Sequence, residues 1–225
     1  MKSERAFTLT ELLVAIALIG ILAALLLTPL RFAKEKAKAA HCLNNLKQWG
    51  TAAQLFAAEH RDYLPQDGFG TPTESKHFIT GWYIQLPETL GLTPYAEMPW
   101  RTNAQADVGK SIWICPSNPR RSNGNNLFHY CLNGLINGTD STKPAIRLSA
   151  LSRPSAIVYL FDNKNIPAVH AIPNSPGSFV HTNLHNGGAQ MNFVDGHAAR
   201  FRNRDYWDFK IHKARTNNPD IVWVP

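Results

Sequence analysis

An uncharged apolar run from Leu12 to Leu30 constrains this chain of 225 residues more than any other feature. At about 1.5 Å of rise per residue, a helix of this length crosses most of a hydrocarbon layer about 30 Å thick. A single carboxylate, Glu11, stands directly before the run. Because a carboxylate beside a bilayer is costly to desolvate, such a residue usually has a cationic partner or a function. The run therefore predicts one membrane-spanning helix with Glu11 as its candidate functional residue.

A cleaved secretory signal and a plain membrane anchor are two simpler interpretations of this run. Against the signal, the basic stretch MKSER is short, the apolar run is too long, and the small residue Ala6 precedes the run instead of following it. A plain anchor explains the length but not Glu11. Basic residues give no orientation, because Lys2 and Arg5 precede the run and four more follow it closely.

The helical pattern continues from residue 31 to residue 59. Apolar residues recur there every three or four positions, which places on one helix face Ala39, Cys42, Leu46, Trp49, Ala53 and Phe56. We expect one helix from residue 7 to about residue 60, kinked at Pro29. Its first half would lie in a membrane and its second half would pack on a domain.

The leader MKSERA followed by FTLTELLVAIALIGILAAL resembles the class III signal peptide of type IV pilins and type II secretion pseudopilins. In that family a prepilin peptidase cuts before the Phe and methylates the new amino terminus. The resemblance implies cleavage between Ala6 and Phe7, N-methylation of Phe7, and a Glu11 four residues after the new terminus. The sequence departs from the family in having Ala6 where Gly is usual and in placing Pro29 one position late.

The same resemblance implies a partner for Glu11. In the family this Glu pairs with the terminal amine of a neighbouring subunit while the filament grows. Such a pair removes the desolvation cost of both charges, since either charge alone stays exposed to hydrocarbon. The alternative is that Glu11 simply rests among the lipid headgroups.

Residues 61–225 alternate short apolar runs with turns and predict one globular domain. With 44% hydrophobic residues, six Trp and eleven Phe, the chain can build a core of ordinary size. Loops are expected at 118–126 and 173–178, and strands at 78–86, 111–115, 156–161, 189–194 and 197–201. The expected fold class is α+β, with the long N-terminal helix packed on a small antiparallel β-sheet, as in pilins.

Four further stretches resemble a large bacterial group of prepilin-type proteins that carry a C-terminal H-X9-DG motif. They are CLNNLKQWGTAAQLFAAEHRDYLP, WICPS, LSRPSAIVYLFD and HNGGAQMNFVDGH, and the motif residues are His185, Asp195 and Gly196. The resemblance implies a leader at 1–6, an assembly helix at 7–30, its continuation at 31–60 and a pilin-like domain at 61–225. It implies no reaction.

The H-X9-DG region predicts a β-hairpin. Apolar and polar residues alternate from Ala189 to Val194, which is typical of a half-buried strand. Asp195-Gly196 favours a tight turn with two positive φ angles, and HAARF can return as the next strand. We expect His185 to cap or hydrogen-bond a neighbouring backbone group, so that the motif is a folding signature. The alternative, in which His185 and Asp195 together hold a metal or a cation, conflicts with the roughly 30 Å that nine strand residues span.

Three cysteines allow at most one intramolecular disulfide. Cys42 lies on the predicted core face of the helix and Cys115 ends the apolar run SIWIC. A bridge between them would contribute on the order of 4 kcal/mol by closing a long loop. The rival arrangements are a Cys115–Cys131 bridge and three buried free thiols.

The sequence favours neither an enzyme nor a cofactor site. No P-loop, nucleophile elbow or dinucleotide motif is present. His181 and His185 would lie one turn apart on a helix, but the Gly-rich sequence after them predicts a loop. The residues able to bind zinc are Asp162, His170, His181, His185, Asp195 and His197. Calcium, which some major pseudopilins bind, is favoured over zinc, but no loop of spaced Asp and Asn supports it. We expect no catalytic residue, no cofactor and no metal.

The segment RFRNRDYWDFKIHKAR, residues 200–215, interleaves basic and aromatic residues in a chain of net charge +7. Such a pattern can grip single-stranded nucleic acid. The favoured interpretation is instead a strand with its aromatic residues inward and its charges outward, so nucleic acid is not an expected partner.

Together these observations predict a structural subunit, a pseudopilin or pilin of a type II secretion-like or type IV pilus-like filament. The alternatives are a membrane-anchored module that binds DNA or polysaccharide and, less favoured, a membrane-tethered enzyme. The implied partners are prepilin peptidase, other pilin or pseudopilin subunits, an inner-membrane assembly platform and membrane lipid. The implied location is the inner membrane, crossed once, with the domain in the periplasm or at the cell surface.

Overall fold

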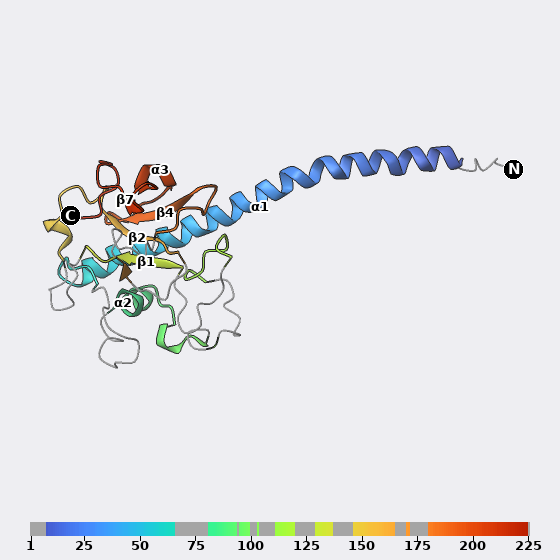
Figure 1. Ribbon diagram of the computed structural model, residues 1–225. Helices are drawn as coiled ribbons and strands as arrows, with labels where there is room; N and C mark the ends of the chain where they lie inside the picture. Colours follow the sequence, from blue (N-terminus) through green and yellow to red (C-terminus); the bar gives the residue numbers. More distant parts are fainter. Residues whose placement is uncertain are drawn as a thin grey trace. The chain divides into compact units, whose positions relative to one another are not determined.

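The computed structural model describes residues 8–65, 81–93, 95–99, 103, 111–119, 129–136, 146–164, 170–171 and 180–224 (Figure 1). These residues belong to two compact units, Met1–Ala37 and Lys38–Pro225, which we describe separately. One helix, α1 (Leu9–Glu59), contributes to both units and contains Pro29. Its bounds agree with the single long helix expected from the sequence. The loop predicted at 173–178 and most of the loop at 118–126 lie outside the described residues.

In the first unit, α1 exposes large apolar side chains on every side. Leu12, Ile19 and Leu27 are 59%, 65% and 67% exposed, and their neighbours are similar. A helix that is apolar all round requires hydrocarbon or a protein partner around it. By length and composition, this part of α1 can cross a membrane, and it is the candidate span among the described residues.

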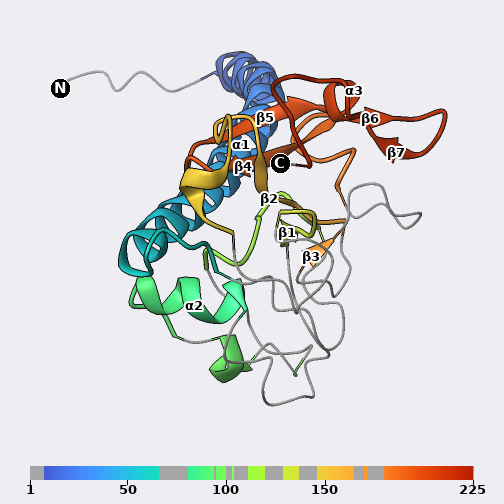
Figure 2. The same cartoon turned by 90° about the vertical axis from the view of Figure 1, so that its left-hand side faces the viewer.

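The second unit is built on a mixed sheet in the strand order β3-β1-β2-β4-β5 (Figure 2). Neighbouring strands are antiparallel except β1 and β3, which are parallel. The strands are β1 (Tyr130–Asn133), β2 (Val158–Asp162), β3 (His170–Ala171), β4 (Gly188–Phe193) and β5 (Ala198–Arg202). The α+β class with a long helix and a small, largely antiparallel sheet is thereby confirmed. A separate two-stranded ribbon pairs β6 (Trp207–Asp208) with β7 (Lys213–Ala214), and the short α3 (Asn203–Tyr206) precedes it.

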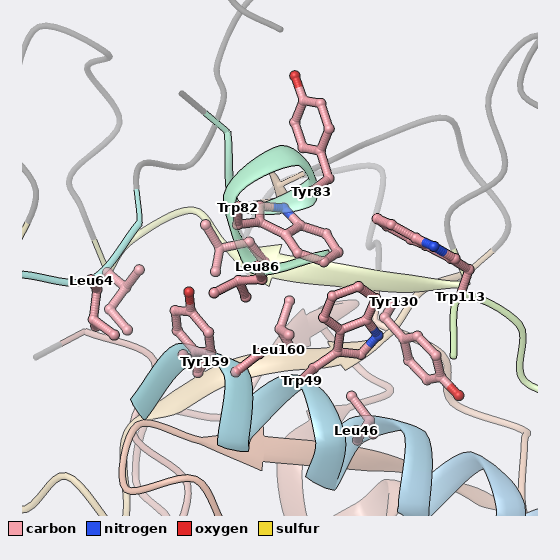
Figure 3. Close-up of a cluster of buried hydrophobic side chains, with 14 of the residues drawn as sticks. Leu46, Trp49, Leu64, Trp82, Tyr83, Leu86, Trp113, Tyr130, Tyr159 and Leu160 are labelled. Atoms are coloured by element: carbon pink, nitrogen blue, oxygen red, sulfur yellow. The ribbon is translucent and has the colours of Figure 1, made fainter. Parts of the chain in front are cut away.

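One core lies between the sheet and α1 (Figure 3). The helix stripe expected from the sequence is buried there, except Ala39, which is half-buried. Trp49 of α1 meets Trp82 and Trp113 with ring centroids 5.6 Å and 4.7 Å apart. These rings pack edge to face, an arrangement that favours aromatic pairs beyond their buried area. The tryptophans thus join α1 to two segments distant in sequence.

A second core covers the other face of the sheet. It packs β1, β2 and β4 against the C-terminal segment, with members that include Phe161, Met191, Phe193, Tyr206, Trp207 and Trp223. Every residue of β4 is therefore buried. The prediction of a half-buried strand was wrong, because the polar residues of the alternation face α1 and not water.

Two predicted strands are not strands. The apolar stretch 78–86 contains the start of a helix, α2 (Trp82–Thr89), and its first three residues lie outside the described part. Residues 111–115 form turns, because side chains of α1 occupy the carbonyl groups that a strand partner would need. Asn45 Nδ2 donates to the Ile114 oxygen (2.8 Å) and Trp49 Nε1 donates to the Ile112 oxygen (3.1 Å). By contrast, the runs predicted at 156–161, 189–194 and 197–201 correspond to β2, β4 and β5.

The β4–β5 turn contains Asp195 and Gly196 but is one residue longer than predicted. The Phe193 N–H donates to the His197 oxygen and the Gly196 N–H to the Phe193 oxygen, both at 2.9 Å. Gly196 has a φ of 90°, whereas Asp195 does not have a positive φ. A three-residue loop that ends in a left-handed glycine is a common hairpin form, and it needs positive φ at one position instead of two.

This turn packs directly on α1 at Gly50. A Cβ atom on Gly50 would lie 2.5 Å from the Gly196 carbonyl oxygen and would also overlap the Asn192 amide. The neighbouring Gln54 side chain donates a hydrogen bond to the Val194 carbonyl oxygen. The glycine in α1 therefore sets how closely the hairpin can approach the helix.

We predict that Gly50→Ala destabilises the domain although alanine is the better helix former. The overlap should cost about 1–3 kcal/mol, against a helix-propensity gain of about 0.5–1 kcal/mol. In a thermal melt of the detergent-solubilised chain this corresponds to a fall of a few degrees, at about 2–4 °C per kcal/mol. Gly20→Ala is the matched control, because nothing lies within 4 Å of a Cβ at Gly20. Equal melting temperatures for the two variants would contradict the close approach.

Candidate functional site

The first candidate region is the start of α1, where Thr8 and Glu11 form a capping box. Glu11 Oε2 accepts hydrogen bonds from the Thr8 N–H (2.9 Å) and the Thr8 hydroxyl (2.7 Å). In return, the Glu11 N–H donates to Thr8 Oγ1 at 3.3 Å. This reciprocal pattern satisfies amide groups at a helix N-terminus that have no partner within the helix.

Glu11 remains exposed in this arrangement, so its carboxylate is accessible to a partner outside the chain. Ala6 and Phe7, the predicted cleavage and methylation residues, lie outside the described residues. The capping box was not foreseen, although the sequence Thr-x-x-Glu before an apolar run signals one. Glu11 can therefore cap its own helix as well as offer a negative charge.

The second candidate region surrounds the side chain of His185, which is fully buried. Its Nε2 lies 3.1 Å from Asp162 Oδ2 and 3.5 Å from Cys115 Sγ. The His185 ring thus contacts a carboxylate and a sulfur atom. The hydrogen bond that we expected between this ring and a neighbouring backbone group is not the interaction that positions it. The expectation was wrong because β2 brings Asp162 beside the motif, and nothing in the local sequence reports that pairing.

His185 and Asp195 do not share a site, as the strand between them predicted. Asp195 accepts hydrogen bonds from His197, through the ring Nδ1 (2.6 Å) and the backbone N–H (3.1 Å). These two side chains are partly exposed, whereas those of His185 and Asp162 are fully buried. The motif therefore marks both ends of β4 instead of one centre.

A left-handed turn places the His185 ring in the core. His185, Asn186 and Gly187 have φ angles of 50°, 63° and 76°, which non-glycine residues adopt only when the surroundings enforce it. Arg200 enforces it here, because its guanidinium donates to the carbonyl oxygens of His185 and Asn186, both at 2.6 Å. At the next position, a Cβ on Gly188 would overlap the Phe201 carbonyl oxygen. The His-Asn-Gly-Gly sequence fits these constraints.

Asp162 is held from the neighbouring strand β4. The Gln190 N–H donates to Asp162 Oδ2 at 2.7 Å, and the Gln190 side chain donates to the Ala39 oxygen of α1 at 2.8 Å. Sequence reasoning missed Gln190 as a buried linking residue. Its position in the polar half of an alternating strand was the available signal, but this signal was assigned to a solvent-facing side.

Cys42 of α1 and Cys115 form a disulfide with a Cα–Cα distance of 4.7 Å. This is the pairing expected from the sequence, although Cys115 lies in a turn and not in a strand. Cys131 is a buried free thiol, and burial raises the pKa of its thiol well above the usual range. A protonated, buried thiol is a poor nucleophile.

The other histidines considered as metal ligands are not gathered around His185, Asp162 and Cys115. His181 lies near this group through its backbone N–H, which donates to the Asp162 carbonyl oxygen at 2.9 Å, and burial lowers the pKa of its ring. His197 is bound to Asp195 instead, and the side chain of His170 lies outside the described part of the chain.

The basic and aromatic segment 200–215 has its aromatic residues mainly inside. Tyr206 and Trp207 belong to the second core, while Phe209 is 52% exposed. Stacking of successive bases requires successive exposed rings. The inward packing expected from the sequence is therefore confirmed for Tyr206 and Trp207 but not for Phe209.

Comparison with known proteins adds one match. Residues 1–27 match the family model of the prokaryotic N-terminal methylation motif. The chain has the N-terminus of a type IV prepilin-like protein. No curated protein and no solved structure matches it. The match ends within α1, so the relation of the domain to the H-X9-DG group stays a resemblance.

We predict that non-reducing peptide mapping of this prepilin-like chain finds Cys42 linked to Cys115. Cys131 should resist an alkylating reagent in the native chain and react once denaturant is added, because its thiol is buried and protonated. Mass spectrometry of the alkylated peptides measures both. A Cys115–Cys131 peptide, or rapid alkylation of native Cys131, would contradict the arrangement.

Proposed function

We propose that this pilin-like precursor is a structural subunit, a pseudopilin or pilin, of a type II secretion-like or type IV pilus-like filament. The observation that carries the proposal is the methylation motif at residues 1–27, which leads into a helix that is apolar on every side. A helix of this kind is suited to two successive environments. Lipid would surround it before assembly, and the equivalent helices of other subunits would surround it in the filament.

Glu11 supplies the specific element of the proposed assembly. Its carboxylate is exposed, and the span from Leu12 to Leu30 contains no other charge. After removal of residues 1–6, the new amine at Phe7 is a cation at the edge of the same apolar segment. Pairing Glu11 of one subunit with the amine of the next would remove two desolvation costs in one contact.

The proposed partners and location follow from this assembly. A prepilin peptidase would cleave and methylate the precursor, and an inner-membrane platform would move subunits from lipid into the filament. The subunit would cross the inner membrane once, with its domain outside the cytosol. The buried disulfide supports that side, because such bonds persist in oxidising compartments. The proposal assigns no enzymatic role to the domain.

Processing gives the first test of this proposal. Mass spectrometry of membrane-extracted protein, from cells with an active prepilin peptidase, should find a mature chain that begins with N-methyl-Phe7. The same analysis in cells without the peptidase should find the uncleaved leader. An intact leader in both strains would overturn the processing step.

The capping box permits a sharper test of Glu11. Glu11→Gln keeps an oxygen that can accept from Thr8 but removes the charge, whereas Thr8→Val removes the hydroxyl cap and keeps the charge. We predict that Glu11→Gln is inserted and cleaved but is at least tenfold less abundant in sheared filaments, because removal of one partner of a buried charge pair costs about 3–5 kcal/mol and about 1.4 kcal/mol is already tenfold. Thr8→Val should be incorporated nearly normally. The reverse order of the two variants would show that Glu11 acts as a helix cap and not as an assembly charge.

A further inference from the structure

Four side chains from distant parts of the sequence converge in the core of the second unit. They are Cys42 of α1, Cys115 of the segment 111–119, Asp162 at the end of β2 and His185 before β4. The two sulfur atoms and a ring nitrogen of His185 all lie within 4.8 Å of one another. Asp162 Oδ2 lies 3.1 Å from His185 Nε2, and both side chains are fully buried.

We propose that the reduced chain binds one zinc ion at this point, with Cys42, Cys115, His185 and Asp162 as ligands, and that formation of the disulfide releases the ion. Two thiolates, an imidazole and a carboxylate are donors that zinc accepts in a closed tetrahedral site. Burial of all four residues is typical of a structural site and not of a catalytic one.

Two of the observed separations are close to those around such an ion. With bonds of about 2.3 Å to sulfur and about 2.0–2.2 Å to nitrogen and oxygen, a tetrahedral ion keeps neighbouring S and N ligands about 3.6 Å apart and N and O ligands about 3.4 Å apart. The corresponding distances are 3.5 Å from Cys115 Sγ to His185 Nε2 and 3.1 Å from His185 Nε2 to Asp162 Oδ2. After reduction, the sulfur atoms would have to rotate apart to about 3.8 Å, and the Asp162 carboxylate, which is outside the group of three with ligand atoms within 4.8 Å, would have to move toward them.

The environment of Asp162 provides independent support. Among the described residues its Oδ1 atom has no hydrogen-bond partner, although it is buried. A buried carboxylate oxygen without a partner is costly, and a cation held by the same carboxylate through Oδ2 would offset part of that cost. A zinc ion with two thiolates and one carboxylate carries a net charge of −1. The guanidinium of Arg200, which donates to the His185 carbonyl oxygen at 2.6 Å, is a cation bonded to one of the four residues.

The exchange between the two states balances. A dithiol reductant gives two electrons and two protons to the Cys42–Cys115 bond, which breaks into two thiols while the reductant becomes a disulfide. Each thiol then releases its proton as zinc binds. In the reverse direction, an oxidising disulfide accepts the two electrons, takes up two protons from the solvent and becomes a dithiol, while the Cys42–Cys115 bond forms again and zinc leaves. Both the zinc-bound state and the disulfide state cross-link α1 to the segment 111–119. The domain would therefore keep this cross-link before and after oxidation.

The test uses the full chain in detergent micelles with Cys131→Ser, so that only the two relevant thiols remain. The chain is reduced with a dithiol, freed of the reductant by gel filtration without oxygen, and titrated with zinc or cobalt. The reduced chain should bind one equivalent of zinc, melt at a higher temperature with zinc than without it, and show a thiolate-to-cobalt charge-transfer band. The oxidised chain should show none of these effects.

Two histidine variants provide the matched comparison. His185→Asn should lower zinc affinity by at least about tenfold, since the loss even of an outer-shell partner costs 10–100-fold. His197→Asn should leave the affinity unchanged, because that ring is bound to Asp195 outside the cluster. Zinc should also slow the alkylation of Cys42 and Cys115, a measurement that needs no further variant.

Several outcomes would overturn the proposal. They are equal uptake by the oxidised and reduced chains, less than stoichiometric uptake by the reduced chain, no protection of the two thiols, and equal affinities for the two histidine variants. A reduced chain that unfolds and is not refolded by zinc would contradict it as well. Processing at Phe7 and assembly through Glu11 do not depend on any of these results.

Discussion

The contact between the second half of α1 and the sheet is the interaction on which the rest of the domain depends. Helix residues from Cys42 to Ala57 cover one face of the sheet, and their removal would expose the tryptophan cluster. Hydrogen bonds between α1 and both the sheet and the segment 111–119 also occupy polar groups that burial would otherwise leave unpaired. Gln190 donates to the Ala39 oxygen and Asn45 donates to the Ile114 oxygen. Breaking the contact would therefore cost both apolar burial and buried hydrogen bonds.

This dependence gives the H-X9-DG motif a structural interpretation. Gly196 lies in the β4–β5 turn, which packs closely against Gly50 of α1. The His185 side chain is buried beside the disulfide that links α1 to the segment 111–119. His185 therefore helps to hold the start of β4 on α1, and Asp195-Gly196 helps to hold its end on the same helix. In the proposed filament, a subunit's assembly helix and the helix at the centre of its domain are one continuous element, α1.

The long helix and most of the sheet could be predicted because their signals are local and periodic. The α1 stripe, the β4–β5 hairpin and the length of the apolar span all follow from spacing along the chain. Residues 111–115 could not be recognised as turns, since the donors that occupy their carbonyl groups come from α1, more than 60 positions away. The partnership of His185 with Asp162 was missed for the same reason, because it depends on which strands pair. The alternation of apolar and polar residues in β4 led to the wrong prediction of a half-buried strand. A polar face of a strand can be buried when a helix supplies its hydrogen-bond partners.

Native-state hydrogen exchange of the solubilised chain tests the central role of the α1–sheet contact most directly. If the contact holds the domain together, the amides of α1 from Cys42 to Ala57 should exchange with the same free energy of opening as those of β2 and β4, close to the global value. Opening of this helix segment at a clearly lower free energy, while β2 and β4 stay protected, would contradict the account.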